Sequence, residues 1–227
     1  MTLQKQTKYI IRITLLYLVS TIIYMPLILK EDVRRAWVFG FHHLWYLEAL
    51  IIGLLLVCIS RKLNTIITGI IAGLLFCIGV LLHMYHSLWG IEWIDSAASF
   101  VSRYGGCRNG VFFAYPLLVL GVIIRKHPLK INTVFLLFLT IISFIMATIE
   151  SAYLKSRLGI YINCDLTFCG WLPAVPIFLL ANNAVSPFHR ETMRTVRKIT
   201  DIAYIIHWWV KELIHCHFEL SRSVGFL

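Results

Sequence analysis

The chain has 227 residues, 59% of them hydrophobic, with a mean hydropathy of +0.79 and a formal charge of +10. Soluble domains contain about 45–50% apolar residues. The apolar excess here is spread along the chain, so the composition predicts an all-α polytopic transmembrane bundle. The charge does not indicate a nucleic-acid partner, because the lysines and arginines stand in short connections between apolar runs, where they set membrane topology.

Seven apolar segments approach the length that a bilayer core demands, about 16–21 residues each. The first is predicted to be a retained helix, because its apolar run is too long for a signal-peptide core. The fourth is short unless it begins near Gly105, and Pro173 and Pro176 predict a bend in the sixth. One membrane domain is expected over residues 1–227, with the spans Tyr9–Leu29, Phe41–Ile59, Ile66–His83, Val111–Ile124, Ile131–Ile149, Leu166–Ala181 and Ile202–His217.

The connections alternate in basic content. Twelve lysines and arginines lie on the N-terminal side of the seven spans, and seven lie on the opposite side. The positive-inside rule then predicts a multi-pass cell-membrane protein in the lipid bilayer, with a cytoplasmic N-terminus and an external C-terminus. The long connection 84–108 has no spanning core, and its composition predicts an external interfacial helix with Trp89 and Trp93 at the headgroups.

The second span opens with polar side chains that have chemical uses at an external rim. His42 and His43 can take a proton near neutral pH, as a general base must, and could activate a hydroxyl of an external acceptor. Glu48 needs a cationic partner or a wet cavity at this depth, and Arg103 or Arg108 lies on the matching side. The alternatives are interfacial histidines bonded to loop backbone and a structural ion pair of Glu48.

Arg108 and Asn109 precede the fourth span, and Glu150 ends the fifth. An arginine at a helix mouth suits a carboxylate or an anionic acceptor, and Glu150 could face the same external cleft. On the cytoplasmic side, Arg12 could meet a phosphate-bearing donor. The alternatives are a snorkelling Arg108 at the interface and an ordinary positive-inside Arg12.

Histidine and cysteine residues near the external side carry weaker signals. His83 and His86 share a helical face, but two histidines alone are a weak metal pattern, and no metal site is predicted. A disulfide from Cys107 to Cys164 or Cys169 suits an oxidising space, and free thiols are the alternative.

Several stretches, in order, resemble helices of one family. FHHLWYLEALIIGLLL is similar to the H-L-W-F-L-x-A-L helix of the acyltransferase-3 family of membrane O-acyltransferases, and RNGVFFAYPLLVLGVIIRK to its R-N-G-x-F-F-x-x-P-x-x-x-L-G helix. KYIIRITLLYLV, IESAYLKSRLG with CDLTFCGWLPAVPIFLL, and ITDIAYIIHWWVKELI resemble further helices of that family. Within it the chain resembles sugar- and wall-modifying members of low-GC bacteria, including the membrane half of vancomycin-resistance serine racemases.

The resemblance implies transfer of an acyl group, usually acetyl from acetyl-CoA, to a hydroxyl of an exported glycan or another cell-envelope acceptor. Arg12 aligns with the second arginine of the family's R-x-x-R motif and would contact the donor. The family usually has ten helices, and its first two, which carry the transfer histidine, and its last have no counterpart here. The external catalytic cleft would be built by His42, His43, Glu48, Arg108, Asn109 and Glu150.

Two other functional classes stay open. The chain could be a truncated, inactive relative, or a partner subunit completed by another chain that supplies the missing helices. It could also be a small-solute carrier, for example an amino-acid exporter. Inverted halves or broken glycine-rich helices would favour a carrier, and no repeat is visible in the sequence.

Overall fold

In the computed structural model the described residues are 3–29, 39–41, 44–103, 105–129, 131–159 and 166–183, and near the C-terminus 192, 195–196, 199–200, 202–207, 209–211 and 214. Over these ranges the chain forms helices and short connections without any strand, so the predicted all-α class is confirmed. The chain divides into two compact units, Met1–Asn183 and Ala184–Leu227. The described residues of the second unit are helical, and a single membrane domain stays a prediction.

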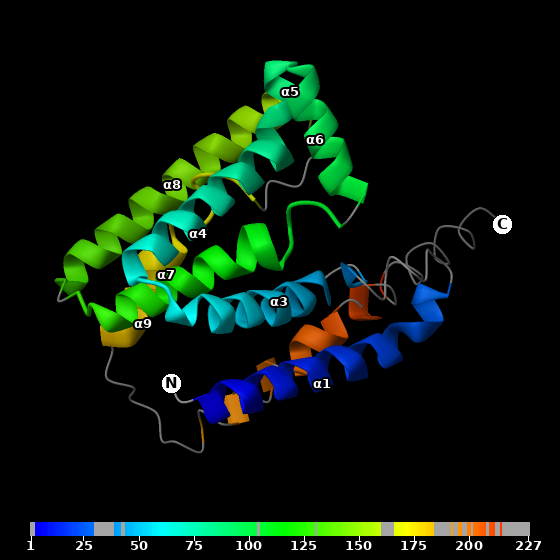
Figure 1. Ribbon diagram of the computed structural model, residues 1–227, viewed down its shortest axis with the longest axis vertical. Helices are drawn as coiled ribbons and strands as arrows, with labels where there is room; N and C mark the ends of the chain where they lie inside the picture. Colours follow the sequence, from blue (N-terminus) through cyan, green and yellow to red (C-terminus); the bar gives the residue numbers. More distant parts are fainter. Residues whose placement is uncertain are drawn as a thin grey trace. The chain divides into compact units, whose positions relative to one another are not determined.

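The first unit contains helices of very different length (Figure 1). In chain order they are α1 (Leu3–Ile28), α3 (Trp45–Ile59), η2 (Ser60–Lys62), α4 (Thr65–Val80), η3 (Leu81–Tyr85), α5 (His86–Trp89), α6 (Glu92–Arg103), η4 (Gly110–Ala114), α7 (Tyr115–Lys126), α8 (Thr133–Leu158) and α9 (Ala174–Asn183). Contacts join α3 to α1, η4 and α7, and α4 to η4 and α7. Further contacts join α8 to α9 and α5, while α6 folds back on η3 and α5.

Three of these helices have an asparagine as their N-cap residue. Asn64 accepts a hydrogen bond from a backbone N–H of the first turn of α4 at 2.9 Å, and Asn132 does the same for α8 at 2.8 Å. Asn109 accepts two such bonds, at 2.9 and 3.0 Å, at the start of η4. The first N–H groups of a helix lack intrahelical partners, so an asparagine at this position promotes a helix start there.

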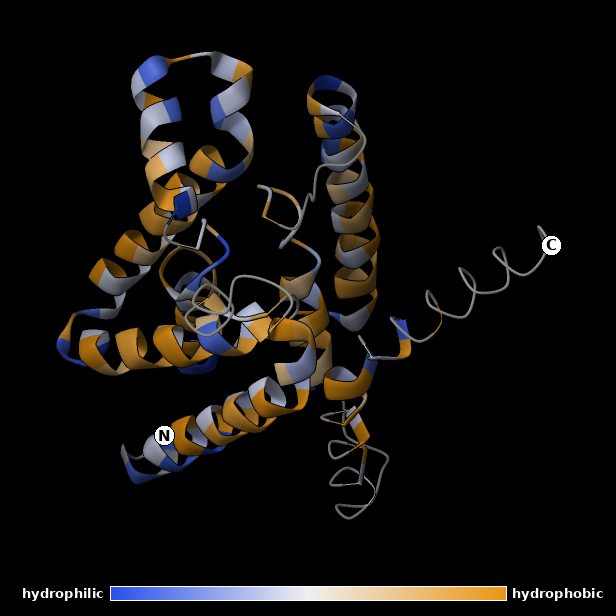
Figure 2. Ribbon diagram, turned by 90° about the vertical axis from the view of Figure 1, so that its right-hand side faces the viewer, coloured by the Kyte–Doolittle hydropathy of each residue, from blue (hydrophilic) through white to orange (hydrophobic). Residues whose placement is uncertain are grey.

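Three helices in the described part of the chain are long and apolar enough to cross a membrane: Gln6–Ile28, Thr65–Trp89 and Thr133–Leu158. The second joins α4, η3 and α5 into one helical rod. Within an 18-residue apolar stretch of each helix, only 28%, 22% and 11% is buried. Figure 2 shows hydrophobic residues along most of the length of the helices. Exposed apolar surfaces this extensive are unusual on soluble monomers, so these helices suit a lipid environment.

The other predicted spans fit the structure less well. α3 begins at Trp45 rather than Phe41, whereas the fourth predicted span, Val111–Ile124, lies within η4 and α7, which together run from Gly110 to Lys126. The span Leu166–Ala181 was expected to be a helix bent at Pro173 and Pro176; the structure instead has turns over residues 168–173, and α9 begins at Ala174. Pro173 and Pro176 have no backbone N–H to donate to a helical hydrogen bond. In the segment before them, the N–H groups of Phe168 and Cys169 donate to the Glu150 carboxylate on α8. Seven spans therefore stay a prediction.

Helices α3 and α4 meet η4 and α7 through small and closely fitted residues. Ala72, Tyr115 and Val119 form a buried cluster at this junction. At Gly110 the approach is closer still, because a Cβ atom added there would lie 2.3 Å from the Cβ of Ile52. Small residues that let helix backbones approach are typical of membrane bundles, where packing rather than a hydrophobic drive joins the helices.

Helix α6 is amphipathic. Ile94 and Ala98 are buried, whereas Trp93 and Phe100 are 71% and 62% exposed. Trp89, at the end of α5, is also exposed. The predicted interfacial helix therefore exists as a helix whose exposed side carries two large aromatic rings among polar residues, and its place at the headgroups stays a prediction.

Candidate functional site

A polar cavity of about 210 Å³, here named the histidine cavity, lies at the C-terminal end of the rod formed by α4, η3 and α5. Residues 82–86, helix α6 and the connection 105–108 close around it. Its volume is below the roughly 300 Å³ of sites for drug-sized molecules, so it suits a small ligand. The lining residues are Leu82, His83, His86, Ala98, Ser102, Gly105, Gly106, Cys107 and Arg108.

His86 is oriented by a carboxylate. Its Nδ1 atom lies 2.8 Å from Oδ1 of Asp95. The two residues meet because Gly90 ends α5 with a φ of 59° and turns the chain back into α6. An ionised carboxylate only accepts hydrogen bonds, so Nδ1 carries a proton, and Nε2 is an acceptor when the ring is neutral. The pair thus supplies a directed polar group to the cavity.

Arg108 is held by an aromatic ring and a tight turn. Its guanidinium carbon lies 5.6 Å from the centroid of the Trp45 ring, a cation–π distance. Gly105 and Gly106 have φ values of 93° and 76°, and the Asn109 side-chain amide donates to the Gly106 carbonyl at 2.8 Å. The ring contact and the turn together orient the side chain of Arg108, which lies between Gly106 and Asn109 in the chain. A guanidinium positioned in this way can bind a carboxylate through two parallel hydrogen bonds.

The thiol of Cys107 forms part of the same wall. Burial raises the pKa of this thiol to about 11, so it is neutral at pH 7 and is not an activated nucleophile. Burial also raises the pKa of the Cys169 thiol, and the nearby Glu150 adds to that shift. Both thiols are free, as one of the two alternatives predicted, whereas Cys164 lies outside the described residues.

Glu150 uses both carboxylate oxygens for hydrogen bonds within the protein. Oε1 accepts from the Tyr85 hydroxyl at 2.5 Å and from Phe168 N at 2.8 Å, and Oε2 accepts from Cys169 N at 2.5 Å. The carboxylate therefore fastens η3 and the connection before α9 to α8. It does not line the histidine cavity, but it positions Tyr85, whose chain neighbour His86 does.

The other residues predicted for the site lie elsewhere. Glu48 is half-buried on α3, within electrostatic range of Tyr17 on α1. Asn109 caps η4, and Arg12 is an exposed residue of α1. His42 and His43 lie outside the described residues. Of the predicted set, the histidine cavity therefore contains Arg108, joined there by two histidines that the prediction did not include.

The sequence contained a signal for those two histidines. His83 and His86 have i, i+3 spacing at the end of an apolar span, and an arginine follows in the next connection. As a metal pattern this spacing is weak, and over the ranges that the structure describes, no three His, Cys, Asp or Glu side chains are grouped to hold a metal ion. Asp95 could not be assigned from spacing, because the turn at Gly90 brings it to His86.

Comparison with curated proteins finds a distant similarity to a protein from Enterococcus faecalis named "Amino-acid racemase". The two sequences are 27% identical over 242 aligned positions, which cover 99% of this chain and 33% of the relative. The chain thus spans about a third of the length of the curated relative that it matches. No protein-family profile and no solved structure matches the chain.

The predicted membership in the acyltransferase-3 family is wrong, because no family profile supports it and the relative that was found is named as a racemase. Acyl transfer to a glycan or another cell-envelope acceptor is wrong for the same reason, and acetyl-CoA as donor followed from that resemblance alone. The motifs misled because leucine, isoleucine, phenylalanine and tryptophan are favoured in any lipid-exposed helix. Short matches among them carry little information about chemistry.

Proposed function

We propose that this chain is a membrane-embedded helical module that binds a small amino acid in the histidine cavity. The observation that carries the proposal is the presence of Arg108 and the carboxylate-oriented His86 around one cavity of about 210 Å³. The name of the curated relative, an amino-acid racemase, supports this class of ligand. Since the chain spans about a third of that relative, the proposal covers amino-acid binding and does not extend to racemisation.

The membrane setting is part of the proposal. Its support is the three long apolar helices with mostly exposed surfaces, together with the basic connections between spans. With α3, the η4–α7 helix and the C-terminal helical residues as further spans, the bundle approaches the seven expected from the sequence. If the N-terminus is cytoplasmic, α1 and α3 cross the membrane outward and back, so that Arg61 and Lys62 are cytoplasmic. The helix Thr65–Trp89 then crosses outward, and the histidine cavity at its C-terminal end is on the external side.

The chemistry of the lining suits both charged groups of an α-amino acid. The Arg108 guanidinium binds the carboxylate through paired N–H donors. Nε2 of His86, kept as an acceptor by Asp95, receives a hydrogen bond from the ammonium group. The Ser102 hydroxyl is available to a polar side chain. The volume of about 210 Å³ is sufficient for glycine, alanine or serine.

A carrier role is the second candidate, and the π-helical turns favour it. η3 contributes Leu82 and His83 to the cavity, and η4 begins two residues after Arg108. Single π-helical turns within α-helices occur frequently at functional sites. Interrupted helices also mark the substrate sites of many secondary transporters. In that case the bound amino acid is moved across the membrane rather than held.

The test is amino-acid binding to the purified chain in nanodiscs, measured by calorimetry with L-serine, D-serine, L-alanine and L-glutamate. We expect serine and alanine to bind and glutamate to bind more weakly. Arg108→Ala should weaken binding at least about tenfold, because a hydrogen bond to a charged group contributes about 1.5–3 kcal/mol. Asp95→Asn should weaken it less, since an acceptor for Nδ1 remains.

The matched control is Arg103→Ala, at the exposed end of α6 and outside the cavity lining. It should leave the affinity unchanged, and equal unfolding temperatures of the variants would exclude misfolding. The proposal fails if none of these amino acids binds, or if Arg103→Ala and Arg108→Ala weaken binding equally. Counterflow of the bound amino acid in proteoliposomes separates a carrier from a static binding site.

A further inference from the structure

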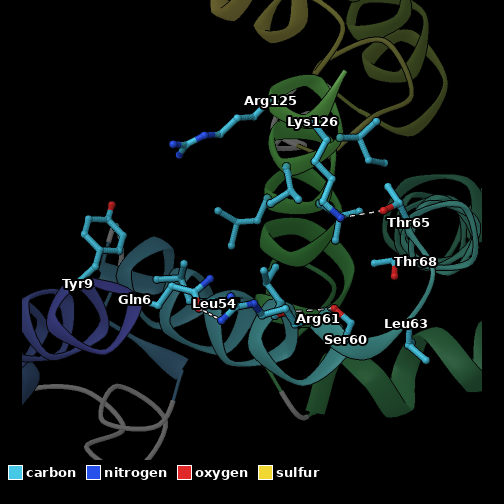
Figure 3. Close-up of a pocket in the computed structure, with 15 residues that line it drawn as sticks. Gln6, Tyr9, Leu54, Ser60, Arg61, Leu63, Thr65, Thr68, Arg125 and Lys126 are labelled. Atoms are coloured by element: carbon cyan, nitrogen blue, oxygen red, sulfur yellow. Dashed lines mark hydrogen bonds between the residues drawn. The ribbon is translucent and has the colours of Figure 1, made fainter. Parts of the chain in front are cut away.

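A second and larger cavity, of about 620 Å³, lies at the other end of α4; we name it the basic cavity. Residues of α1, α3, η2, α4 and α7 line it (Figure 3). Thr68 lines the basic cavity and His83, fifteen residues later, lines the histidine cavity. At 1.5 Å per helical residue the two positions are about 22 Å apart, so the cavities are separate sites.

Three cationic side chains surround the basic cavity: Arg61 from η2, and Arg125 and Lys126 from the end of α7 (Figure 3). Arg61 donates to Oε1 of Gln6 at 3.3 Å, and Lys126 donates to Oγ1 of Thr65 at 2.8 Å. Gln6 and Thr65 are uncharged, and the described residues that line the cavity include no aspartate or glutamate. The cavity therefore has a positive potential that favours an anion.

Much of the remaining wall of the basic cavity is apolar. Leu54 and Val57 come from α3, and Leu118, Val122 and Ile123 come from α7. An inorganic anion would bind the cations and leave this wall in contact with water. A ligand with an anionic head and a hydrocarbon chain would satisfy both parts, because burial of each methylene group contributes about 0.8 kcal/mol.

We propose that the basic cavity binds an anionic phospholipid. The phosphate lies between Arg61, Arg125 and Lys126, and the first part of an acyl chain lies against α3 and α7. A lipid is favoured over a free phosphate because the cavity is far larger than a phosphate and much of its wall is aliphatic. The proposal shares the membrane setting of the amino-acid module, but it does not depend on amino-acid binding at the other end of α4.

The test follows thermal unfolding of the full chain in detergent as a function of added ligand. The ligands are dioleoylphosphatidylglycerol, dioleoylphosphatidylcholine, glycerol phosphate and inorganic phosphate. We expect phosphatidylglycerol alone to raise the unfolding temperature in a saturable way. The triple variant Arg61→Gln, Arg125→Gln, Lys126→Gln should raise its half-saturating concentration at least about tenfold, since each cation near a lipid phosphate contributes to affinity.

The matched control is Arg103→Gln, Lys155→Gln, Arg157→Gln, which removes the same charge from exposed positions outside the basic cavity. It should keep the wild-type response. Val122→Trp, at a partly exposed position of the apolar wall, should weaken phosphatidylglycerol binding without removing a charge.

Three results would overturn the lipid proposal. These are equal stabilisation by phosphatidylcholine, equal stabilisation by inorganic phosphate, which would indicate a free-anion site, and equal loss in both triple variants. Calorimetry with serine on the same proteins keeps the two sites distinguishable. Intact serine binding without a lipid response refutes the lipid site alone, and the reverse result refutes the amino-acid site alone.

Discussion

The histidine cavity and the basic cavity lie at opposite ends of one helical rod and are built in different ways. Around the histidine cavity, short-range contacts orient the polar groups: Asp95 holds His86, and Trp45 and a tight turn hold Arg108. Around the basic cavity, long cationic side chains surround an aliphatic wall. The first arrangement can discriminate between small ligands by geometry, whereas the second selects mainly by charge and apolar area.

The difference also concerns which parts of the fold each cavity needs. The histidine cavity depends on η3, which Glu150 fastens to α8 through Tyr85. The basic cavity depends on α1, α3, α4 and α7. Substitutions can therefore separate the two ends, and the following predictions run from the largest expected effect to the smallest.

Glu150→Ala should have the largest effect. It leaves the Tyr85 hydroxyl and the backbone N–H groups of Phe168 and Cys169 without their acceptor. Hydrogen bonds to a charged group contribute about 1.5–3 kcal/mol each, so we expect at least about 3 kcal/mol less free energy of unfolding, measured by denaturant titration in detergent. Serine binding should be lost and the phosphatidylglycerol response kept.

Glu150→Gln is the control for that substitution, because its amide oxygen keeps one acceptor and the shape of the side chain. It should cost less than half as much stability as the alanine variant. An unchanged unfolding midpoint in Glu150→Ala would show that the three hydrogen bonds do not hold η3 in place. Equal damage at both cavities would show that the two ends are not independent.

Gly110→Ala should affect both cavities, because Gly110 lies where α3 and η4 meet. An added Cβ would lie 2.3 Å from the Cβ of Ile52 and 2.8 Å from the carbonyl oxygen of Ala49. Overpacking of this kind costs about 1–3 kcal/mol. We expect an equal loss of affinity for serine and for phosphatidylglycerol, together with a lower unfolding temperature.

Gly73→Ala is the matched control on α4, where an added Cβ meets no atom within 4 Å. Alanine is the better helix former by up to about 1 kcal/mol, so this variant should be neutral or more stable. If Gly110→Ala unfolds at the same temperature as Gly73→Ala, the close approach of α3 and η4 is not required.

The smallest effect concerns Cys107, tested in a chain whose other five cysteines are serine. Because its pKa is raised to about 11, about 0.1% of the thiol is ionised at pH 8, against roughly a quarter of an ordinary thiol. Alkylation should therefore be roughly two hundredfold slower than in the denatured chain and should rise about tenfold per pH unit up to pH 10.

Serine should slow this alkylation further, because Cys107 lines the histidine cavity, and phosphatidylglycerol should not. Equal rates in the folded and denatured chains at pH 8 would show that the thiol is accessible and ordinary. Protection by the lipid and not by serine would contradict the assignment of ligands to the two ends.

The fold was more predictable than the site. The apolar runs locate α1, α4 and α8, because lipid exposure requires many consecutive apolar side chains, although α1 begins six residues before its predicted span and α8 ends nine residues after its own. The start of α9 was not predictable, since the segment before it is held by Glu150, 18 and 19 residues earlier in the chain. Arg108, named from its position at a helix mouth, lines the histidine cavity and its role there stays a prediction, whereas the place of His86 depends on its contact with Asp95.

The amino-acid sequence by itself determined the helical class, the three long apolar helices and the asparagine caps that begin α4 and α8. These features depend on neighbours within a few residues or on the solvent that a side chain prefers. Only the tertiary structure decided which polar groups share a cavity. Arg61 and Arg125 stand 64 positions apart, and no local rule brings such residues together, because their distance depends on how whole helices pack.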